Sequence, residues 1–249
     1  MRVKSILVSQ PKPQSESSPY YEIEKSNKIK IDFRPFIQVK GVDAKDVRQQ
    51  KIDFSRITAV IFTSRNAIDH FFRLAEELRY TVPDSMKYFC ESEAIAFYLQ
   101  KYIVYRKRKI YIGEKVFKDL IPLFKKHKEE HFLLPCSDVM KDDIPNTLNT
   151  LKLDWQKAIL FRTVSSDLSD LEDVKYDILV FFTPSGIKSL FENFPNFKQD
   201  STRIAAFGKS TVDMAKECGL RIDIEVPTKE TPSMTMALDK YVKQVNKGK

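Results

Sequence analysis

Short apolar runs alternate with amphipathic stretches along most of the chain. A short apolar run that ends at polar or turn residues predicts a buried strand, and the clearest examples are residues 5–9, 58–62 and 177–182. The same pattern predicts further strands at 86–89, 109–112, 132–134, 203–207 and 222–226. Apolar residues spaced by three and four predict helices at about 67–75, 92–102, 116–126, 143–151, 187–191, 212–218 and 233–245. This alternation of strands and helices is typical of parallel sheets that are covered on both faces.

Two longer segments have the alternating pattern of an extended chain. In residues 28–42, the side chains of Ile29, Ile31 and Phe33 alternate with polar ones, and Pro35 interrupts the pattern. Residues 157–164 form the second extended segment.

The chain also contains a weak internal repeat. Residues 61–68 (IFTSRNAI) match residues 180–187 (VFFTPSGI). A second match at nearly constant spacing pairs Cys90 with Gly208 and Ser92 with Ser210. Two weak matches in the same order indicate two lobes that share one strand–turn–helix unit.

The repeat predicts an α/β fold with two similar lobes, each a doubly wound parallel sheet. The remaining strand–turn–helix units of the lobe that contains the N-terminal strand begin only at about residue 165. We therefore expect one lobe to be inserted in the other. The first lobe would comprise residues 1–34 and 165–249, and the inserted lobe residues 38–160. The extended segments 28–42 and 157–164 would cross between the lobes and pair as a two-stranded β ladder, which would form a hinge over a cleft.

Small polar residues occupy the turns between the predicted strands and helices. Ser64 and Thr183 follow a buried strand and precede a helix, which is the N-cap position, and Pro184 suits the first helical residue. Comparable places are occupied by Ser210 or Thr211 and by Thr228 or Ser233. For any one of these hydroxyls, capping of its own helix is the simpler interpretation.

Taken together, the turns predict a binding site for a ligand with several anionic groups. Ligands of doubly wound sheets bind at the carboxyl ends of the strands, where helix N-termini offer free N–H groups and a positive dipole end. We therefore expect a ligand between the lobes, bound by Ser64, Arg65, Asn66, Thr183, Ser185, Gly186, Gly208, Ser210, Thr211 and Thr228.

Charge and cysteine content narrow the possible partners and compartment. The chain has 249 residues and a formal net charge of +8. This positive charge would attract a polyanion, such as nucleic acid, an anionic membrane or a multiply charged small molecule. Alternatively, it only keeps the protein soluble. Its three cysteines are far apart and odd in number, which favours a reducing compartment over a disulfide framework. The longest apolar run, residues 178–182, is far shorter than the roughly 20 residues that span a bilayer. We expect a soluble, cytoplasmic protein that does not bind a membrane.

Other candidate chemistries are weaker. His127 and His131 could share a helix face, but the lysines around them favour a solvated face over a metal site. The basic run 106–109, with tyrosines nearby, is compatible with RNA binding, although a basic turn before a strand explains it as well. The sequence has no GxGxxG, GxxxxGK[ST], HExxH or GxSxG pattern, so it predicts neither a nucleotide-binding loop nor a Ser-His-Asp triad.

In their order along the chain, the motifs resemble those of the uroporphyrinogen-III synthase family. The similar stretches are FTSRNAI (62–68), ILFRTV (159–164), FFTPSGI (181–187), AAFGKST (205–211) and VPT (226–228). Each stretch is short and degenerate, but their order and spacing extend over nearly the whole chain. The resemblance implies two α/β lobes joined by a two-stranded ladder, which is also the topology that the repeat predicts.

The resemblance further implies an activity, namely cyclisation of hydroxymethylbilane, a linear tetrapyrrole, with inversion of the last pyrrole ring and loss of water, in haem biosynthesis. It implies that neither a metal nor a cofactor is used, and that the partner is this small molecule and not nucleic acid or a membrane. We expect a monomer. The eight carboxylates of the substrate suit a basic protein with several helix N-termini. Catalysis would rest largely on folding the substrate so that the correct ring atoms meet.

The chain departs from the family pattern in ways that affect the predicted mechanism. Phe161 stands where the family often has a tyrosine that is the usual candidate for assisting hydroxyl departure, so the catalytic residues stay unassigned. Alternatively, position 161 is a packing position at which either ring serves. Ser9-Gln10-Pro11 stands in place of Thr-Arg-Pro, and Cys90 stands in place of a glycine. The alternative function is therefore a relative that binds a tetrapyrrole or another polyanion without converting it, and a nucleic-acid-binding protein, which rests on charge alone, is the weakest candidate.

Overall fold

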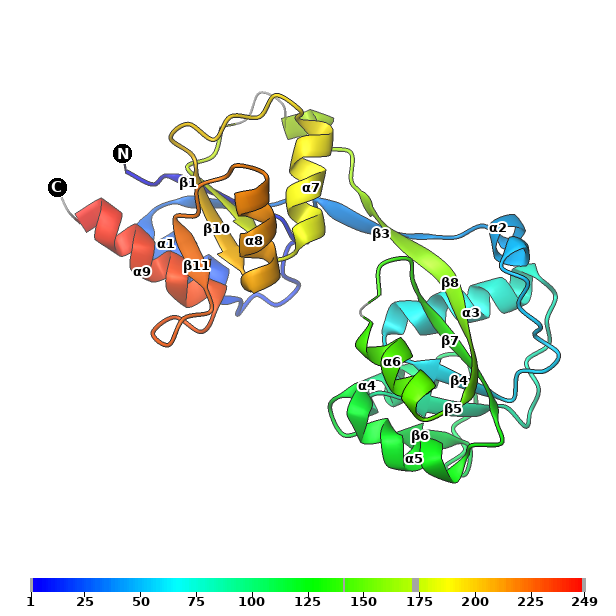
Figure 1. Cartoon of the computed structure of the whole chain (residues 1–249). Coiled ribbons are helices and arrows are strands. Elements are labelled where there is room, and N and C mark those ends of the chain that lie inside the picture. The colour runs from blue at the N-terminus through cyan, green and yellow to red at the C-terminus, as the bar shows by residue number, and fades with distance from the viewer. Residues whose placement is uncertain (1, 141, 172–174, 248–249) are drawn as a thin grey trace. The chain divides into compact units, whose positions relative to one another are not determined.

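The computed structural model describes residues 2–140, 142–171 and 175–247 (Figure 1). The chain divides into two compact units. Unit 1 comprises Met1–Gln38 and Val164–Lys249, and unit 2, which is inserted between these segments, comprises Val39–Thr163. Residues 1 and 248–249, which the predicted first lobe includes, lie outside the described residues.

Unit 1 is built on a five-stranded parallel sheet. Its strands are β1 (Ser5–Val8), β2 (Lys30–Phe33), β9 (Ile178–Phe181), β10 (Arg203–Phe207) and β11 (Ile224–Val226). They lie in the order β11-β10-β9-β1-β2, and all neighbours pair in parallel. These pairings confirm the parallel sheet that the alternation of elements predicts.

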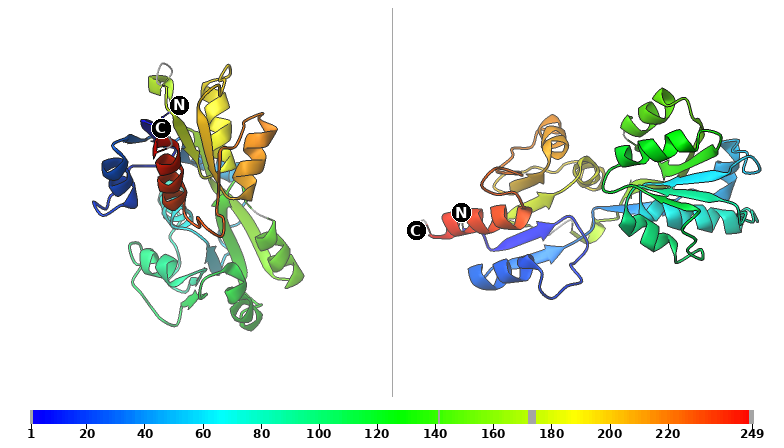
Figure 2. Two further views of the ribbon diagram at one scale, coloured as in Figure 1. Left: turned by 90° about the vertical axis from the view of Figure 1, so that its left-hand side faces the viewer. Right: turned by 90° about the horizontal axis from the view of Figure 1, so that it is seen from below.

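Helices cover both faces of this sheet because successive side chains of a strand point to opposite faces. The helices of unit 1 are α1 (Pro19–Asn27), α7 (Pro184–Asn193), α8 (Lys209–Glu217) and α9 (Met234–Lys247), and a short 3₁₀ helix, η2 (Ser169–Leu171), precedes β9. Ile6 of β1 packs in a core with α1 and α9, whereas its neighbour Leu7 packs in a core with α7 and α8. Figure 2 shows the helices on both sides of the sheet.

Unit 2 repeats this construction. Its strands are β3 (Ile37–Gly41), which begins in unit 1, β4 (Ala59–Phe62), β5 (Lys87–Cys90), β6 (Ile110–Ile112), β7 (His131–Ser137) and β8 (Asp154–Ser165), which ends in unit 1. They lie in the order β3-β8-β7-β4-β5-β6, and the pairs from β8 to β6 are parallel.

The helices of unit 2 also lie on both faces of its sheet. They are α2 (Ala44–Gln49), α3 (Arg65–Glu77), α4 (Glu93–Leu99), the 3₁₀ helix η1 (Phe117–Leu120), α5 (Ile121–Lys126) and α6 (Asp143–Thr150). Val60 of β4 packs in a core with α3 and α4, whereas its neighbour Ile61 packs in a core with α5 and α6.

Strands β3 and β8 connect the two units and pair with each other. The amide of Val42 donates to the Leu160 carbonyl oxygen, and the amide of Ser166 donates to the Phe36 carbonyl oxygen, each at 2.9 Å. These two bonds pair the chain in opposite directions, so the ladder is antiparallel. The sequence-based prediction was wrong about residues 28–42, because this segment is not one crossing strand. Its first half, β2, pairs with β1 in unit 1, and only the part after Pro35 crosses.

The apolar pattern missed two helices and merged two others. In α1, Ile23 is the sole residue buried, and in α2 only Val47 is buried, so neither helix has an extended apolar face. The predicted helix at 116–126 is a 3₁₀ turn followed by α5, which begins next to Pro122. Within the described ranges, no helix is long and apolar enough to cross a membrane.

Candidate functional site

The carboxyl ends of the parallel strands in each unit carry most of the residues that the sequence selects. In a doubly wound sheet this edge is where ligands bind. In unit 2 the turn after β4 leads into α3, and in unit 1 the turns after β9 and β10 lead into α7 and α8. Each of these helices has its N-terminus, and so its free N–H groups, at the carboxyl edge of its own sheet.

Ser64 and Thr183 cap their helices with the same geometry. Both have extended backbones, and Ser64 Oγ accepts from the amide of Ala67 at 3.1 Å, while Thr183 Oγ1 accepts from the amide of Gly186 at 3.2 Å. The capping interpretation is therefore confirmed for both residues. A cap uses the oxygen as an acceptor, so the hydroxyl proton can still be donated to an anionic ligand.

The residues after these caps differ in accessibility. Arg65 and Asn66, the first two residues of α3, are exposed. Ser185 of α7 is half-buried and Gly186 is buried. A Cβ atom on Gly186 would lie 3.8 Å from Ser9 Oγ, which shows that the end of β1 adjoins the N-terminus of α7.

The turn after β10 is shorter than the sequence predicts. Helix α8 begins at Lys209, so Ser210 and Thr211 lie in its first turn, with Ser210 exposed and Thr211 only 1% exposed. Gly208 is the N-cap and has a φ of 84°. Gly208, which has no side chain, and Ser210 are therefore accessible to a ligand, whereas the side chain of Thr211 is not.

The second match of the repeat is displaced by two residues. Phe62 pairs with Cys90 in one sheet, and Phe181 pairs with Ala206 in the other. Cys90 therefore corresponds to Ala206, and the N-cap Ser92 corresponds to the N-cap Gly208. Cys90 is fully buried at the end of β5, and burial raises the pKa of its thiol to about 12, so it is neither at the turn nor a reactive thiol.

Thr228 closes a turn and does not cap a helix. It is exposed, its Oγ1 accepts from the amide of Thr231 at 3.0 Å, and its hydroxyl lies 2.7 Å from the Thr231 hydroxyl. The comparable helix position belongs to Ser233, whose Oγ accepts from the amide of Met236 in α9 at 3.3 Å.

Phe161 lies on β8 with its ring buried at 7% exposure. The ring stacks on that of His70 from α3, with 5.2 Å between the ring centres. Burial, followed by the charge of Arg73, lowers the pKa of His70 below its usual range. Arg73 donates to His70 Nδ1 at 3.2 Å and to the Val42 carbonyl oxygen at 2.8 Å, which ties α3 to the end of β3. Neither His70 nor Arg73 stands out in the sequence, because both lie on the polar side of an amphipathic pattern.

The side chains around Arg65 were also not anticipated. Its guanidinium carbon lies 5.3 Å from the centre of the Tyr98 ring on α4, and the Tyr98 hydroxyl lies 2.9 Å from both carboxylate oxygens of Asp69. The spacing of Arg65 and Asp69 by four residues was a local signal that these two side chains share a helix face, but it does not indicate Tyr98.

The two histidines considered for a metal site have other roles. His131, at the start of β7, lies 2.5 Å from an Asp154 carboxylate oxygen, and the His127 ring packs against Tyr111 with 4.4 Å between the ring centres. In the part of the chain that the structure describes, no group of three or more histidine, cysteine or acidic side chains is arranged to hold a metal ion.

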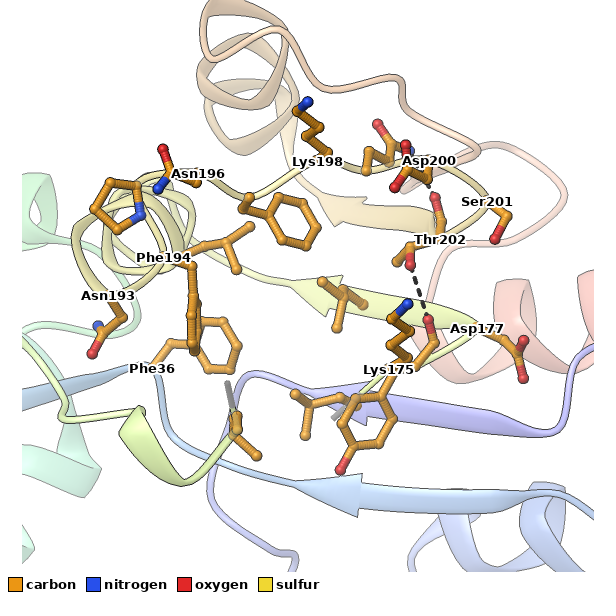
Figure 3. A pocket seen from close by; sticks show the side chains of 18 residues that line it. Phe36, Lys175, Asp177, Asn193, Phe194, Asn196, Lys198, Asp200, Ser201 and Thr202 are labelled. Atoms are coloured by element: carbon orange, nitrogen blue, oxygen red, sulfur yellow. Dashed lines mark hydrogen bonds between the residues drawn. The ribbon is translucent and has the colours of Figure 1, made fainter. Parts of the chain in front are cut away.

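A cavity of about 630 Å³ lies elsewhere in unit 1 (Figure 3). Its lining includes Leu7, Leu179, Phe194, Asp177 and Thr202. Asp177 and Thr202 directly precede β9 and β10. The cavity therefore lies toward the amino ends of these strands, away from the capped turns.

The chain is similar to known proteins both in sequence and in structure. A family model described as Uroporphyrinogen-III synthase HemD matches residues 22–236. A search of curated proteins found no match. The crystal structure of uroporphyrinogen-III synthetase from Helicobacter pylori is similar with a TM-score of 0.62 and 17% identity, covering 97% of this chain and 99% of that chain. A mutant uroporphyrinogen III synthase from Thermus thermophilus has a TM-score of 0.53 and 14% identity, with coverage of 97% and 99%. At these identities the structural likeness concerns the fold.

Proposed function

The chain belongs to the uroporphyrinogen-III synthase family, and from this premise we propose that the capped turns of both units bind the substrate of that enzyme. The function is cyclisation of hydroxymethylbilane with inversion of the last pyrrole ring and loss of water, in tetrapyrrole biosynthesis. The observation that carries this function is the family match over residues 22–236. No observation favours the non-catalytic alternative.

The proposed binding residues suit the charge of this substrate. Its carboxylates would accept hydrogen bonds from the free N–H groups at the N-termini of α3, α7 and α8 and from the hydroxyls of Ser64 and Thr183. Arg65 would add a charge-assisted hydrogen bond at the start of α3. The backbone N–H groups would supply most of the binding, and they stay in place when a side chain is substituted. The loss of one hydroxyl is therefore expected to cost only about 1 kcal/mol of binding free energy.

The proposed catalysis rests on geometry. The enzyme would hold both ends of the linear tetrapyrrole so that the reacting ring atoms meet. This fixed geometry replaces a rare encounter and can lower the activation free energy by several kcal/mol. A hydrogen-bond donor would assist departure of the hydroxyl, and backbone dipoles would stabilise the cationic azafulvene that results. Phe161 offers no donor, and its burial against His70 supports the interpretation of position 161 as a packing position.

We also propose that the protein works as a monomer, without a metal or cofactor, in the cytoplasm, with lobes at residues 1–34 plus 165–249 and 38–160. A reducing compartment is supported by the three cysteines, which are free thiols, two of them buried. We further propose that nucleic acid is not a partner, since the basic run 106–109 is explained as well by a basic turn before a strand.

Activity is tested with hydroxymethylbilane that the preceding enzyme of the pathway makes in situ. The product is oxidised, and the isomers are separated by chromatography. Type III above the background of spontaneous type I is expected. Type I alone, together with intact tetrapyrrole binding, would favour the non-catalytic relative.

The proposed site is tested separately with a pair of matched variants of α8. Ser210→Leu places a bulky side chain at the exposed N-terminal turn of the helix, and Glu217→Leu places the same side chain at its exposed C-terminal end. We expect Ser210→Leu to raise KM several-fold and Glu217→Leu to leave it unchanged. Equal KM values for both variants would show that the turn after β10 does not contact the substrate.

A further inference from the structure

Arg65 is held by an aromatic ring from another helix. It is the first residue of α3 and is exposed at the carboxyl edge of unit 2. Its guanidinium carbon lies 5.3 Å from the centre of the Tyr98 ring. A guanidinium within about 6 Å of a ring centre is attracted by the negative face of the ring, so Tyr98 restricts where the Arg65 side chain lies.

Tyr98 is in turn held in place by Asp69. The Tyr98 hydroxyl lies 2.9 Å from both oxygens of the Asp69 carboxylate, to which the Tyr102 hydroxyl also donates at 2.5 Å. Burial by itself raises the pKa of Asp69, but the hydrogen bonds from Tyr102 and Tyr98 outweigh it and the pKa is lowered, so the acceptor is ionised near neutral pH. Lys101 completes the cluster, with its Nζ 3.5 Å from Asp69 and 5.5 Å from the centre of the Tyr98 ring.

The internal repeat shows that the fold does not require this cluster. Ser64 corresponds to Thr183, and Ser92 corresponds to Gly208, so each member of the cluster has a counterpart in unit 1. Counted from these caps, the pairs are Arg65 and Pro184, Asp69 and Lys188, Tyr98 and Met214, and Tyr102 and Cys218. Helices α7 and α8 pack on one face of their sheet although the arginine, the carboxylate and the two phenols are all replaced at these places.

We propose that Tyr98 is a positioning residue that holds the Arg65 guanidinium for a carboxylate of the substrate. The proposal rests on the proposed function, in which the turn after β4 binds substrate. An arginine side chain that is already ordered loses less conformational entropy when it binds. Because a substrate carboxylate that does not take part in the reaction keeps its contact with Arg65 through the transition state, the benefit is expected in KM and not in kcat.

The test compares substitutions of Tyr98 in two backgrounds, with purified hydroxymethylbilane as the probe. Tyr98→Leu is expected to raise KM about two- to fivefold, the scale of one exposed cation–π contact, with kcat unchanged. Tyr98→Phe keeps the ring and is expected to retain most of the wild-type KM. In an Arg65→Gln background, Tyr98→Leu should raise KM no further, because the group that it positions is gone.

Tyr241→Leu is the matched control. It removes a second tyrosine–arginine pair, in which the Tyr241 ring centre lies 5.9 Å from the Arg203 guanidinium carbon and Arg203 Nε donates to the Tyr241 hydroxyl at 3.1 Å. Arg203 is the first residue of β10, at the amino end of the strand, so KM should not change. Unfolding in urea, measured for every variant, reports any loss of packing between α3 and α4.

The outcomes separate this proposal from the one on which it rests. If Arg65→Gln raises KM but Tyr98→Leu raises it equally in both backgrounds, or lowers kcat instead, Tyr98 does not position Arg65. If Arg65→Gln leaves KM unchanged, Arg65 does not bind substrate and the role of Tyr98 is overturned, whereas binding by the N–H groups and the Ser64 hydroxyl of that turn still stands. Formation of the type III isomer would still establish the activity in that case.

Discussion

At the equivalent strand ends of the two units, the following helix is capped in the same way, but the side chains around the cap differ. After β4 and after β9, a hydroxyl caps the following helix, Ser64 in unit 2 and Thr183 in unit 1, at nearly equal hydrogen-bond lengths. One strand further, the caps differ, because Ser92 has an extended φ of −148° whereas Gly208 has a φ of 84°. The first helical residue is Arg65 in one unit and Pro184 in the other.

The features that recur in both units are those that the fold requires, and the features found in one unit alone are candidates for binding a ligand. The hydroxyl cap recurs because each helix must satisfy the N–H groups of its first turn. The charged cluster of Arg65, Asp69 and Tyr98 does not recur, so the packing of the shared strand–turn–helix unit does not require it. Further along the same helices, His70 and its counterpart Ser189 also differ, although both face the chain that crosses between the units. His70 stacks on Phe161, and Ser189 donates to the Phe36 carbonyl oxygen.

The largest effect is expected where the two units differ in backbone conformation. Gly208→Val should lower the free energy of unfolding by about 1–3 kcal/mol, because side chains are rarely tolerated at such a φ. No atom lies within 4 Å of a Cβ at this position, so the cost would come from the backbone and not from a clash. Ser92→Gly, the reverse exchange in unit 2, should cost only a few tenths of a kcal/mol. Urea unfolding of both variants checks this, and equal losses would refute the argument from φ.

The shared caps should contribute equally in the two units. Ser64→Ala and Thr183→Ala should each lower the free energy of unfolding by about 1 kcal/mol, because each leaves a helix N–H without its acceptor. Ser210→Ala is the control, since Ser210 is exposed inside a helix and is expected to change stability by less than about 0.5 kcal/mol. A clear difference between the Ser64 and Thr183 variants would show that the two caps are not equivalent.

A smaller effect is expected at Phe161. Because its ring is buried against His70, Phe161→Tyr should change kcat by less than about twofold, which is below the effect of one new hydrogen bond to a developing charge. The ratio of type III to type I product should not change. Rate, isomer ratio and melting temperature are to be measured together. A several-fold faster variant with intact stability would show that a tyrosine hydroxyl at this position can assist departure of the leaving group.

The smallest effect concerns pH and is specific to unit 2. The pKa of His70 is lowered by burial and then by Arg73, so the unfolded chain binds this proton more tightly than the folded one. The contribution of His70 to the free energy of unfolding is therefore lost as the pH falls from about 6.5, the pKa of His70 in the unfolded chain, through its lower pKa in the folded protein. His70→Gln should lose less stability than wild type between pH 7 and pH 5, measured by urea unfolding. Parallel pH profiles would contradict this, and Ser189 offers no such titration in unit 1.

Most elements and the inserted topology could be predicted because their signals are local or repeat along the chain. The run before Thr183 is apolar throughout and forms β9, which is buried on both faces. Helices α1 and α2 could not be predicted in this way, since each buries only one residue and tertiary contacts hold them. The equivalence of Cys90 and Gly208 was wrong by two residues, because the segment between the two caps is longer in unit 2 (Ser64 to Ser92) than in unit 1 (Thr183 to Gly208), and only strand pairing reveals this.

The sequence by itself determined the caps, the parallel sheets and the set of polar turns, because each depends on residues that are neighbours in the chain. Only the tertiary structure decided which turn residues are usable. It buries Thr211 inside the first turn of α8, and it places Tyr98 of α4 against Arg65 of α3. These outcomes depend on how two helices lie side by side on one sheet, and that contact joins residues too far apart in the chain for any local pattern to link them.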